Sequence, residues 1–439
     1  MKDILIPFPE LAEQIFSHIK DGQCVSLIGL SNSGKSALMR FLASPLAVEH
    51  CQKIRGREGV TVYVDCNRAV AISAQAFYEV VIRSILERIG EELQEPLANS
   101  LRDYHQSITE AANAFSASLS FNLALTDLCE DFDRDICLLL DEFDEIYAAL
   151  DDRALLNLRA LYDRFSDRLV LVTATIRALT VLRGREFADE FAELVVHSTY
   201  PLPALRDNEM DVLLDDLGLP FLDEKRKKLC KDFGGGHPGL VYATAQVLGC
   251  SSHERKDDLF QFVAREPQPR AECLKIWNQL TETEAEALTS FVLEQEAGLP
   301  KSQMSALERI GMIHDGHIFS PVFEDFIARR GRRPDIADEG VYLDTDSGDV
   351  WVDGIRIPVL TELEFKLLSL LYERMDKVTD KYRIVTAVWG EAYLGDVDDA
   401  RVEKLVSRLR SKIESDPSNP RYLVTLRGRG YKLLSRAAS

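Results

Sequence analysis

The sequence predicts a multidomain protein in which an α/β domain with a parallel sheet comes first and a smaller α+β domain comes last. The chain has 439 residues, which is more than one hydrophobic core usually organises. Short apolar runs alternate with helical patterns over the first half of the chain. The net charge is −20, yet the segment from residue 401 onward holds ten Lys or Arg and three acids, which sets the last domain apart.

The composition excludes several classes of protein. Hydrophobic residues are 46% and charged residues 28%, which is typical of folded globular domains and not of disordered chains. No apolar run approaches the ~18 residues that span a bilayer, and the first residues lack the basic and then apolar order of a targeting signal. The eight cysteines occur singly, without a CxxC pair that would hold zinc. We therefore expect a cytoplasmic protein with no membrane contact.

A phosphate-binding motif follows the first apolar strand, residues 24–28. Gly29, Gly34, Lys35 and Ser36 have the spacing GxxxxGKS. Such a loop presents backbone N–H groups to phosphate, the next helix adds its positive end, and the lysine and serine reach the phosphates and Mg²⁺. The motif predicts an ATP–Mg²⁺ site formed by Gly29, Ser31, Asn32, Ser33, Gly34, Lys35, Ser36 and Ala37.

A fold built around such a phosphate loop also needs a second strand, one that ends in acidic residues, and residues 136–140 supply it. This run is apolar throughout and ends in Asp141 and Glu142. We expect Ser36 and Asp141 to hold Mg²⁺, and Glu142 to orient or deprotonate the attacking water. Three more apolar runs would complete the parallel sheet, namely residues 59–66, 168–175 and 194–202.

The run 168–175 also carries residues that could contact the γ-phosphate. Ligands of open α/β sheets bind at the carboxyl ends of the strands, where Thr173 or Thr175 would lie. Arg177 follows immediately. Thr175 and Arg177 therefore join Glu142 as predicted catalytic residues, and whether hydrolysis needs an arginine from a neighbouring copy stays open.

A glycine-rich turn interrupts the helical pattern of residues 205–268. Gly234, Gly235 and Gly236 precede His237 and Pro238, a stiff bend that opens a helix. Together with the two phosphate-site motifs, this GGHPGL turn resembles that of the STAND signal-transduction ATPases, which are related to AAA+ proteins. The resemblance covers roughly residues 1–330 and implies that His237 and Pro238 close over the nucleotide. We divide this region into an ATPase core (1–203), a helical lid (204–276) and a winged-helix-like domain (277–331).

The predicted winged-helix-like domain combines two amphipathic helices with a hairpin at Asp315 and Gly316. It resembles the winged helix that follows the lid in STAND ATPases. Its second helix carries only Arg309 as a basic residue, so we expect it to pack on the ATPase rather than bind DNA.

A different kind of domain follows the polar linker 332–340. Short strands precede a helix capped by Thr361 and Glu364, then a basic helix and a hairpin. Residues 341–439 resemble the OmpR/PhoB-type winged-helix domain of bacterial response regulators at LTELEFKLL, VWG, SRLRSKI, DPSNPRYL and TLRGRGYKLL.

The OmpR/PhoB resemblance implies that helix 402–413 enters the major groove of double-stranded DNA and that Arg427 reaches the minor groove. Helical spacing places Val402, Leu405, Val406 and Leu409 on the core face. The predicted DNA-binding residues are Arg401, Lys404, Arg408, Ser411, Lys412, Arg427 and Arg429. Leu405 and Ala400 also stand where the family often has His and Arg on its reading face, so the family's sequence preference does not transfer.

Three functions fit these features. The leading hypothesis is a transcription regulator in which ATP binding, with an unidentified signal, changes a nucleotide-dependent homo-oligomer and slow hydrolysis resets it. The second is a DNA-remodelling ATPase, such as an initiator or transposition-type ATPase. The third is a defence or stress sensor that assembles on DNA. The sequence alone does not separate them.

Overall fold

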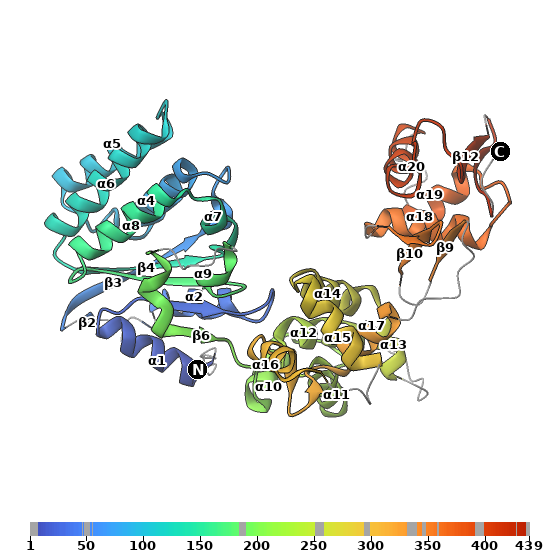
Figure 1. Cartoon of the computed structure of the whole chain (residues 1–439), viewed down its shortest axis with the longest axis horizontal. Coiled ribbons are helices and arrows are strands. Elements are labelled where there is room, and N and C mark those ends of the chain that lie inside the picture. Colours follow the sequence, from blue (N-terminus) through green and yellow to red (C-terminus); the bar gives the residue numbers. More distant parts are fainter. Residues whose placement is uncertain are drawn as a thin grey trace. The chain divides into compact units, whose positions relative to one another are not determined.

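The computed structural model describes residues 8–45, 47, 53–54, 56–183, 190–250, 259–293, 299–331, 340–344, 348–357, 360–390, 399–426 and 428–435 (Figure 1). The chain forms two compact units, Met1–Glu324 and Asp325–Ser439. The division falls inside helix α17 (Pro321–Gly331). The predicted linker lies outside the described residues except for Gly340.

A six-stranded sheet in the order β2-β3-β4-β5-β1-β6 organises the first unit. Every neighbouring pair is parallel except β2 with β3, so the predicted parallel α/β fold is confirmed. The strands are β1 (Val25–Ile28), β2 (Lys53–Ile54), β3 (Arg57–Asp65), β4 (Asp135–Asp141), β5 (Leu169–Thr175) and β6 (Thr199–Pro201). Asp65 pairs with Asp141 and Ile28 with Thr175, which brings four strand ends to one edge of the sheet.

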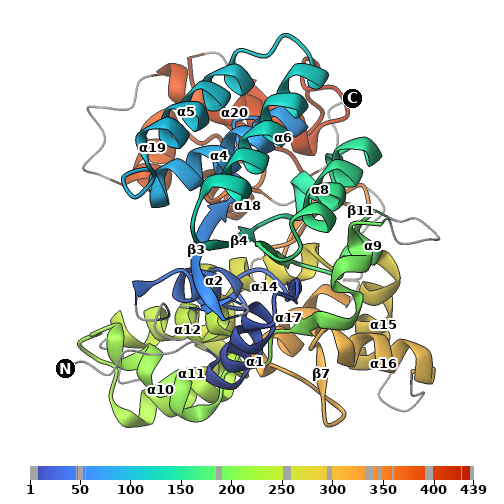
Figure 2. The same ribbon diagram turned by 90° about the vertical axis from the view of Figure 1, so that its left-hand side faces the viewer.

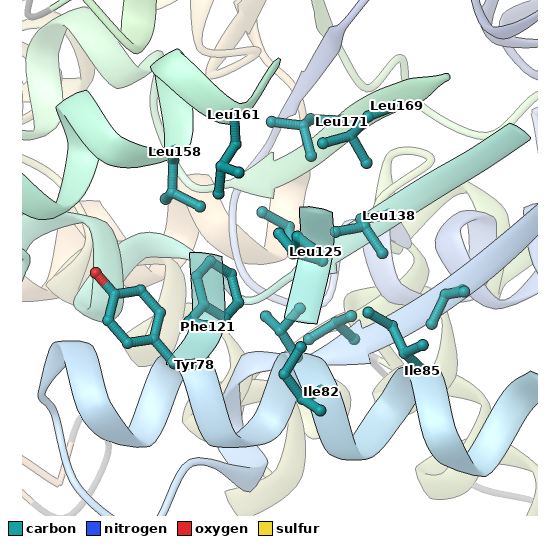
Figure 3. Close-up of a cluster of buried hydrophobic side chains, with 14 of the residues drawn as sticks. Tyr78, Ile82, Ile85, Phe121, Leu125, Leu138, Leu158, Leu161, Leu169 and Leu171 are labelled. Carbon is teal, nitrogen blue, oxygen red and sulfur yellow. The ribbon is translucent and has the colours of Figure 1, made fainter. Parts of the chain in front are cut away.

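Helices cover both faces of this sheet (Figures 1 and 2). One face carries α1 (Pro9–Lys20) and α2 (Lys35–Leu42). The other carries α4 (Ala74–Ile89), α5 (Glu95–Thr109), α6 (Ala114–Asp131) and α8 (Asp152–Arg164). Figure 3 shows the core of this second face, where Tyr78 and Phe121 stack at 4.3 Å between ring centroids. All seven residues of β4 and of β5 are buried, because helices cover the sheet on both sides.

The expected strand over residues 194–202 is wrong for its first five residues. Ala192–Ser198 forms a 3₁₀-helix, η2, and only Thr199–Pro201 pairs with β1. Ala192, Val195 and Ser198 are buried at a spacing of three, the period of a 3₁₀-helix. The Ser198 hydroxyl donates to the carbonyl oxygen of Cys24 at 2.5 Å. The apolar run therefore reflects one buried 3₁₀ face, which an apolar pattern alone does not distinguish from a strand.

Short elements and a helical region complete the first unit. The short elements are η1 (Cys66–Arg68), α7 (Asp144–Ala149) and α9 (Leu179–Leu182). The helical region holds α10 (Asp207–Asp216), α11 (Glu224–Gly234), α12 (Pro238–Cys250), α13 (Leu259–Arg265), α14 (Pro267–Asn278), α15 (Glu282–Leu293) and α16 (Lys301–Arg309). The predicted hairpin is confirmed as β7 (Ile313–His314) and β8 (His317–Ile318), with Asp315 and Gly316 both at positive φ.

The glycine turn before α12 fits closely against this hairpin. Gly235 has φ +58°, and a Cβ there would lie 1.8 Å from the carbonyl oxygen of Phe319. Only glycine combines this backbone conformation with such a close approach. Among the residues that the structure describes, no helix is long and apolar enough to cross a membrane.

The second unit has its own sheet, helices and core. Strands β9 (Val341–Leu343), β10 (Val350–Val352) and β11 (Ile355–Arg356) form an antiparallel sheet, and β12 (Leu423–Leu426) pairs with β13 (Gly430–Leu433). Helices α18 (Glu362–Glu373), α19 (Lys381–Trp389) and α20 (Asp399–Ile413) surround buried Leu367, Ile384 and Leu409. The predicted capping box of Thr361 and Glu364 is confirmed. This arrangement is the α+β winged-helix fold expected from the sequence.

Candidate functional site

The loop between β1 and α2 has the backbone shape that phosphate binding needs. Asn32 and Gly34 have φ of 56° and 105°. A Cβ at Gly34 would lie 2.8 Å from the ring of Phe8, so glycine is required there. Helix α2 begins at Lys35, which places its positive end at the loop.

Lys35 is 4% exposed and is held by the loop itself. Its ammonium donates to the carbonyl oxygens of Gly29 at 2.6 Å and Leu30 at 3.1 Å. Burial lowers the pKa of Lys35, and the nearby carboxylates of Glu142, Asp144 and Asp141 oppose this shift. An anion arriving at the loop would therefore meet a poorly solvated cation, the setting in which charge-assisted contacts are strong.

The acidic end of β4 lies against this loop. Asp141 is 1% exposed and accepts a hydrogen bond of 2.7 Å from the Tyr63 hydroxyl. Glu142 has a φ of 52°, which is uncommon for a residue other than glycine, and its Oε1 lies 3.5 Å from the Ser36 hydroxyl. Carboxylate and hydroxyl oxygens of this kind suit Mg²⁺. The predicted residues Ser36 and Glu142 thus meet, with Asp141 beside them.

A cavity of 630 Å³ opens between the loop and helices α12 and α14. Its lining includes Asn32, Gly34, Lys35, Ser36, Ala37, Glu142 and Pro238, all predicted from the sequence. Leu213, Tyr242 and Ala243 add apolar surface from α10 and α12. The volume falls in the range of small-molecule sites, and the charges fit a nucleotide with its Mg²⁺.

The helical region holds the phosphate loop at two adjacent residues. His237 Nε2 lies 3.1 Å from the Ser31 carbonyl oxygen, and the backbone N–H of Gly239 donates to the Asn32 carbonyl oxygen at 3.1 Å. The Asn32 amide also donates to Glu272 at 2.8 Å. The phosphate loop is therefore in direct contact with α12 and α14.

His237 has a defined tautomer in this setting. The backbone N–H of Leu240 donates to its Nδ1 at 3.3 Å, so the ring proton belongs on Nε2, where it donates to Ser31. Burial lowers the pKa of His237 to about 4. The neutral ring satisfies both contacts at pH 7, whereas a second proton would point at the Leu240 N–H.

The side chains of Thr175 and Arg177 are held by hydrogen bonds within their own turn and with residues at and before α15. Thr175 is fully buried, and its hydroxyl donates to the carbonyl oxygen of Arg177 at 2.7 Å. The Arg177 guanidinium donates to Glu284 at 2.8 Å and to the Gln279 carbonyl oxygen at 2.9 Å. The Gln279 side chain accepts from the Ser31 N–H at 2.8 Å. The catalytic roles of Thr175 and Arg177 stay predictions.

Sequence reasoning missed four residues of this site: Tyr63, Glu272, Gln279 and Glu284. Tyr63 carried one usable signal. In the parallel register of β3 with β4 it lies opposite Leu139, and Leu139 is two residues before Asp141. The other three left none, because acids and amides on helices are usually solvated.

Gly29, Ser33, His237 and Arg177 line a second cavity of 570 Å³ that also reaches α16.

The predicted DNA-binding face lies on α20. Arg401, Lys404, Arg408 and Ser411 are exposed, and Val402, Val406 and Leu409 are buried, as their spacing requires. Leu405 is 5% exposed and belongs to the hydrophobic core. The family resemblance, which placed Leu405 on the reading face, was therefore wrong for this residue, because Leu405 packs in the core. Ala400 is exposed.

The remaining basic residues differ in their contacts. Lys412 donates to Glu364 at 2.7 Å, so its ammonium already has a partner within the domain. Burial would raise the pKa of Glu364, but Lys412 and the Thr361 N–H hold it below its usual value. Arg429 is exposed at the turn between β12 and β13. Arg427 lies outside the described residues.

The chain has two parts, an α/β unit whose phosphate loop and sheet resemble those of P-loop ATPases and a winged-helix domain of the OmpR/PhoB type. Residues 358–433 match the family model described as "Transcriptional regulatory protein, C terminal". The chain is 42% identical over 115 residues to the sensory transduction protein RegX3 of Mycolicibacterium smegmatis, covering 24% of this chain and 49% of that protein. RegX3 of Mycobacterium tuberculosis is 44% identical over 93 residues, covering 21% and 40%. The chain thus spans about half the length of the curated relatives it matches or less.

Solved structures similar to this chain fall into two groups. The Walker-type ATPase PABY2304 of Pyrococcus abyssi is 13% identical, with 74% of this chain and 97% of that chain covered and a TM-score of 0.45. The ORC2 protein of Aeropyrum pernix is 14% identical, with 75% and 86% covered and a TM-score of 0.43. The DNA-binding domain of Klebsiella pneumoniae RstA is 24% identical, with 23% and 97% covered and a TM-score of 0.21.

Proposed function

We propose that this protein is an ATP-dependent transcription regulator of the STAND type, in which the nucleotide state of the first unit controls DNA binding by the second. The observation that carries this proposal is the segment 279–284. Gln279 contacts the phosphate loop through Ser31, while Gln279 and Glu284 together bind Arg177. The phosphate loop and the predicted catalytic residue Arg177 are thus both in contact with the short segment that joins α14 to the first turn of α15.

The phosphate site supplies binding and hydrolysis. The loop N–H groups and Lys35 would bind the ATP phosphates, and Ser36 and Asp141 would hold Mg²⁺, which would supply charge to neutralise the phosphates. To do so, Lys35 exchanges its contacts with Gly29 and Leu30 for phosphate oxygens. Glu142 accepts the proton of the attacking water. Slow turnover suits this role, because hydrolysis resets a switch rather than driving continuous work.

Arg177 connects this site to the helical region. Its side chain is 16% exposed and that of Glu284 is 13% exposed, so the pair is largely desolvated. Burial would raise the pKa of Glu284, but Arg177 holds it below its usual value. A γ-phosphate that competes for Arg177 would release the segment 279–284, since a buried carboxylate without its partner is unstable. We assign the boundary 203/204 to one joint of this movement. The predicted boundary 276/277 lies inside α14, so the other joint would follow the end of this helix at Asn278.

The second unit reads double-stranded DNA through α20 and the β12–β13 hairpin. Arg401, Lys404 and Arg408 occupy the exposed face, where cations displace counterions from the phosphate backbone. Nucleotide-dependent association of several copies would array these domains on repeated sites. A regulator acts where its DNA is, so the cytoplasmic location expected from the sequence belongs to this proposal.

The Glu284→Gln substitution tests the switch. The amide keeps the shape but loses the charge that holds Arg177, so the variant should bind DNA without ATP as wild type does with ATP. Glu282→Gln, at an exposed position of the same helix, is the matched control and should behave as wild type. DNA affinity measured by fluorescence anisotropy with and without ATP decides between them. An unchanged ATP requirement in Glu284→Gln would remove the switch from this segment.

A further inference from the structure

Helix α6 has one face that none of the described elements covers. The helix packs against α4, α5 and α8. Phe121 stacks on Tyr78 of α4, Asp127 accepts from the Tyr104 hydroxyl of α5 at 2.9 Å, and Ser118 accepts from the Asn157 amide of α8 at 2.9 Å. These contacts use three sides of the helix and leave the fourth to the outside.

The fourth side carries large apolar residues. Phe115 is 76% exposed, Leu119 49% and Leu123 40%. They follow one another at intervals of four, so they form one stripe along the helix, which we call the α6 stripe. Single exposed leucines are common, but an aligned set of this kind marks an interaction site.

The α6 stripe lies in a segment without charge. Residues 111–126, AANAFSASLSFNLALT, contain no Lys, Arg, Asp or Glu, although the chain carries a net charge of −20. A DNA-contacting face or a face for anionic membranes needs cations, which this segment lacks. Neither the nucleotide cavity nor the second cavity is lined by α6. The stripe is therefore suited to another protein surface.

We propose that the α6 stripe binds the α6 stripe of a second copy of this chain. Copies with a charge of −20 repel each other, and a face without carboxylates lets them meet without burying like charges. The stripe is also its own complement, since apolar side chains on one copy face apolar side chains on the other around a two-fold axis. Half-buried Ser116 and Ser120 lie beside the stripe, and their small size leaves grooves for the large side chains.

The pairing should be modest in strength. Three anchors from each copy make the centre of an interface, with polar residues of α5 and α8 at its rim. An interface of this size associates on the order of micromolar. The α6 stripe contacts neither the phosphate loop nor the segment 279–284, so pairing should not require nucleotide. This inference adds a dimer surface to the proposed function, and its test needs neither ATP nor DNA.

Sedimentation velocity of the full chain, without nucleotide or DNA, tests the pairing. Wild type should dimerise as its concentration rises, and Leu119→Glu should raise the dimer dissociation constant at least about tenfold, because two carboxylates would meet at the axis. Val196→Glu adds the same charge at another exposed apolar residue, 46% exposed on η2, and should leave dimerisation unchanged. Equal thermal unfolding of the two variants shows that both are folded.

A charge-swap mixture separates self-pairing from other uses of the α6 stripe. Leu119→Glu and Leu119→Lys should each dimerise at least about tenfold more weakly than wild type when alone, and should form mixed dimers together, since residue 119 of one copy faces residue 119 of the other. Wild type that stays monomeric up to about 100 µM would overturn the proposal. So would dimers that Leu119→Glu leaves intact, or a mixture that remains monomeric. Wild-type monomers that bind zwitterionic phosphatidylcholine vesicles through Leu119 would assign the stripe to a lipid surface instead.

Discussion

Lys35 is the residue on which the proposed nucleotide binding should depend most, because its buried ammonium donates to the carbonyl oxygens of Gly29 and Leu30, which phosphate oxygens would replace. Nearby, Ser36, Asp141 and Glu142 meet as their motifs indicate. A motif predicts such residues well, since the loop and the strand end are local features. Residues that approach from the helical region, such as Glu272 and Gln279, have no local signal, since only the tertiary fold brings them to the loop.

Lys35→Ala should weaken ATP binding by about 3 kcal/mol, roughly a hundredfold, because a charge-assisted contact in a poorly solvated site is lost. Isothermal titration calorimetry with ATP–Mg²⁺ measures this. Glu142→Gln is the matched variant and should bind ATP normally while hydrolysis stops, since an amide cannot accept the proton. Equal ATP affinity in Lys35→Ala and wild type would contradict the phosphate-loop assignment.

His237 should make the stability of the first unit sensitive to acid. Its folded pKa is about 4, below the unfolded value near 6.5. Between these two pH values the unfolded chain takes up a proton that the folded chain refuses, so the free energy of unfolding falls as pH drops from about 6.5 to 4. The contribution is complete above this window and amounts to at most about 3 kcal/mol.

The substitution His237→Gln, whose amide reaches the position of the histidine Nε2, keeps a donor for Ser31 but removes the titration. Urea unfolding at pH 7 and pH 5 should therefore show a larger loss of stability in wild type than in this variant. The same loss in both proteins would mean that the acid sensitivity comes from other groups.

Among the elements, those with a regular pattern were predicted best. Strands β4 and β5 appear as continuous apolar runs because both faces of the sheet are covered. Helix α20 divides into an exposed basic face and a buried apolar face at helical spacing. The pattern fails at η2, whose buried residues are three apart. At Leu405 the family resemblance placed the residue on the reading face and the helical period placed it in the core, and the period was right.

The exposed face of α20 should determine DNA affinity. Lys404→Ala should weaken binding of the full chain to its preferred duplex by about 1–3 kcal/mol, because a groove-facing contact is lost. Lys366→Ala is the matched control, since Lys366 is half-exposed on α18 and pairs with Glu362. Anisotropy titrations at one salt concentration compare the two. Equal losses in both variants would mean that α20 is not the recognition helix.

At the scale of the whole molecule, the net charge opposes the proposed binding of DNA. The chain carries −20 overall, so its acidic surface repels DNA, while residues from 401 onward carry ten Lys or Arg. The second unit has its own hydrophobic core and can present this basic face by itself. Nucleotide-controlled association would add binding energy by presenting several such faces to one DNA molecule, which is how an acidic regulator can still bind tightly.

The measurement that tests the central claim most directly is DNA affinity of the full chain with and without ATP. A duplex selected in vitro by the full chain serves as the probe, and Glu142→Gln serves as the form that retains ATP. We expect ATP–Mg²⁺ to tighten DNA binding of this variant at least about tenfold. Lys35→Ala should show no response to ATP. If Glu142→Gln binds ATP and yet has the same DNA affinity with ATP as without it, the first unit does not control the DNA-binding unit.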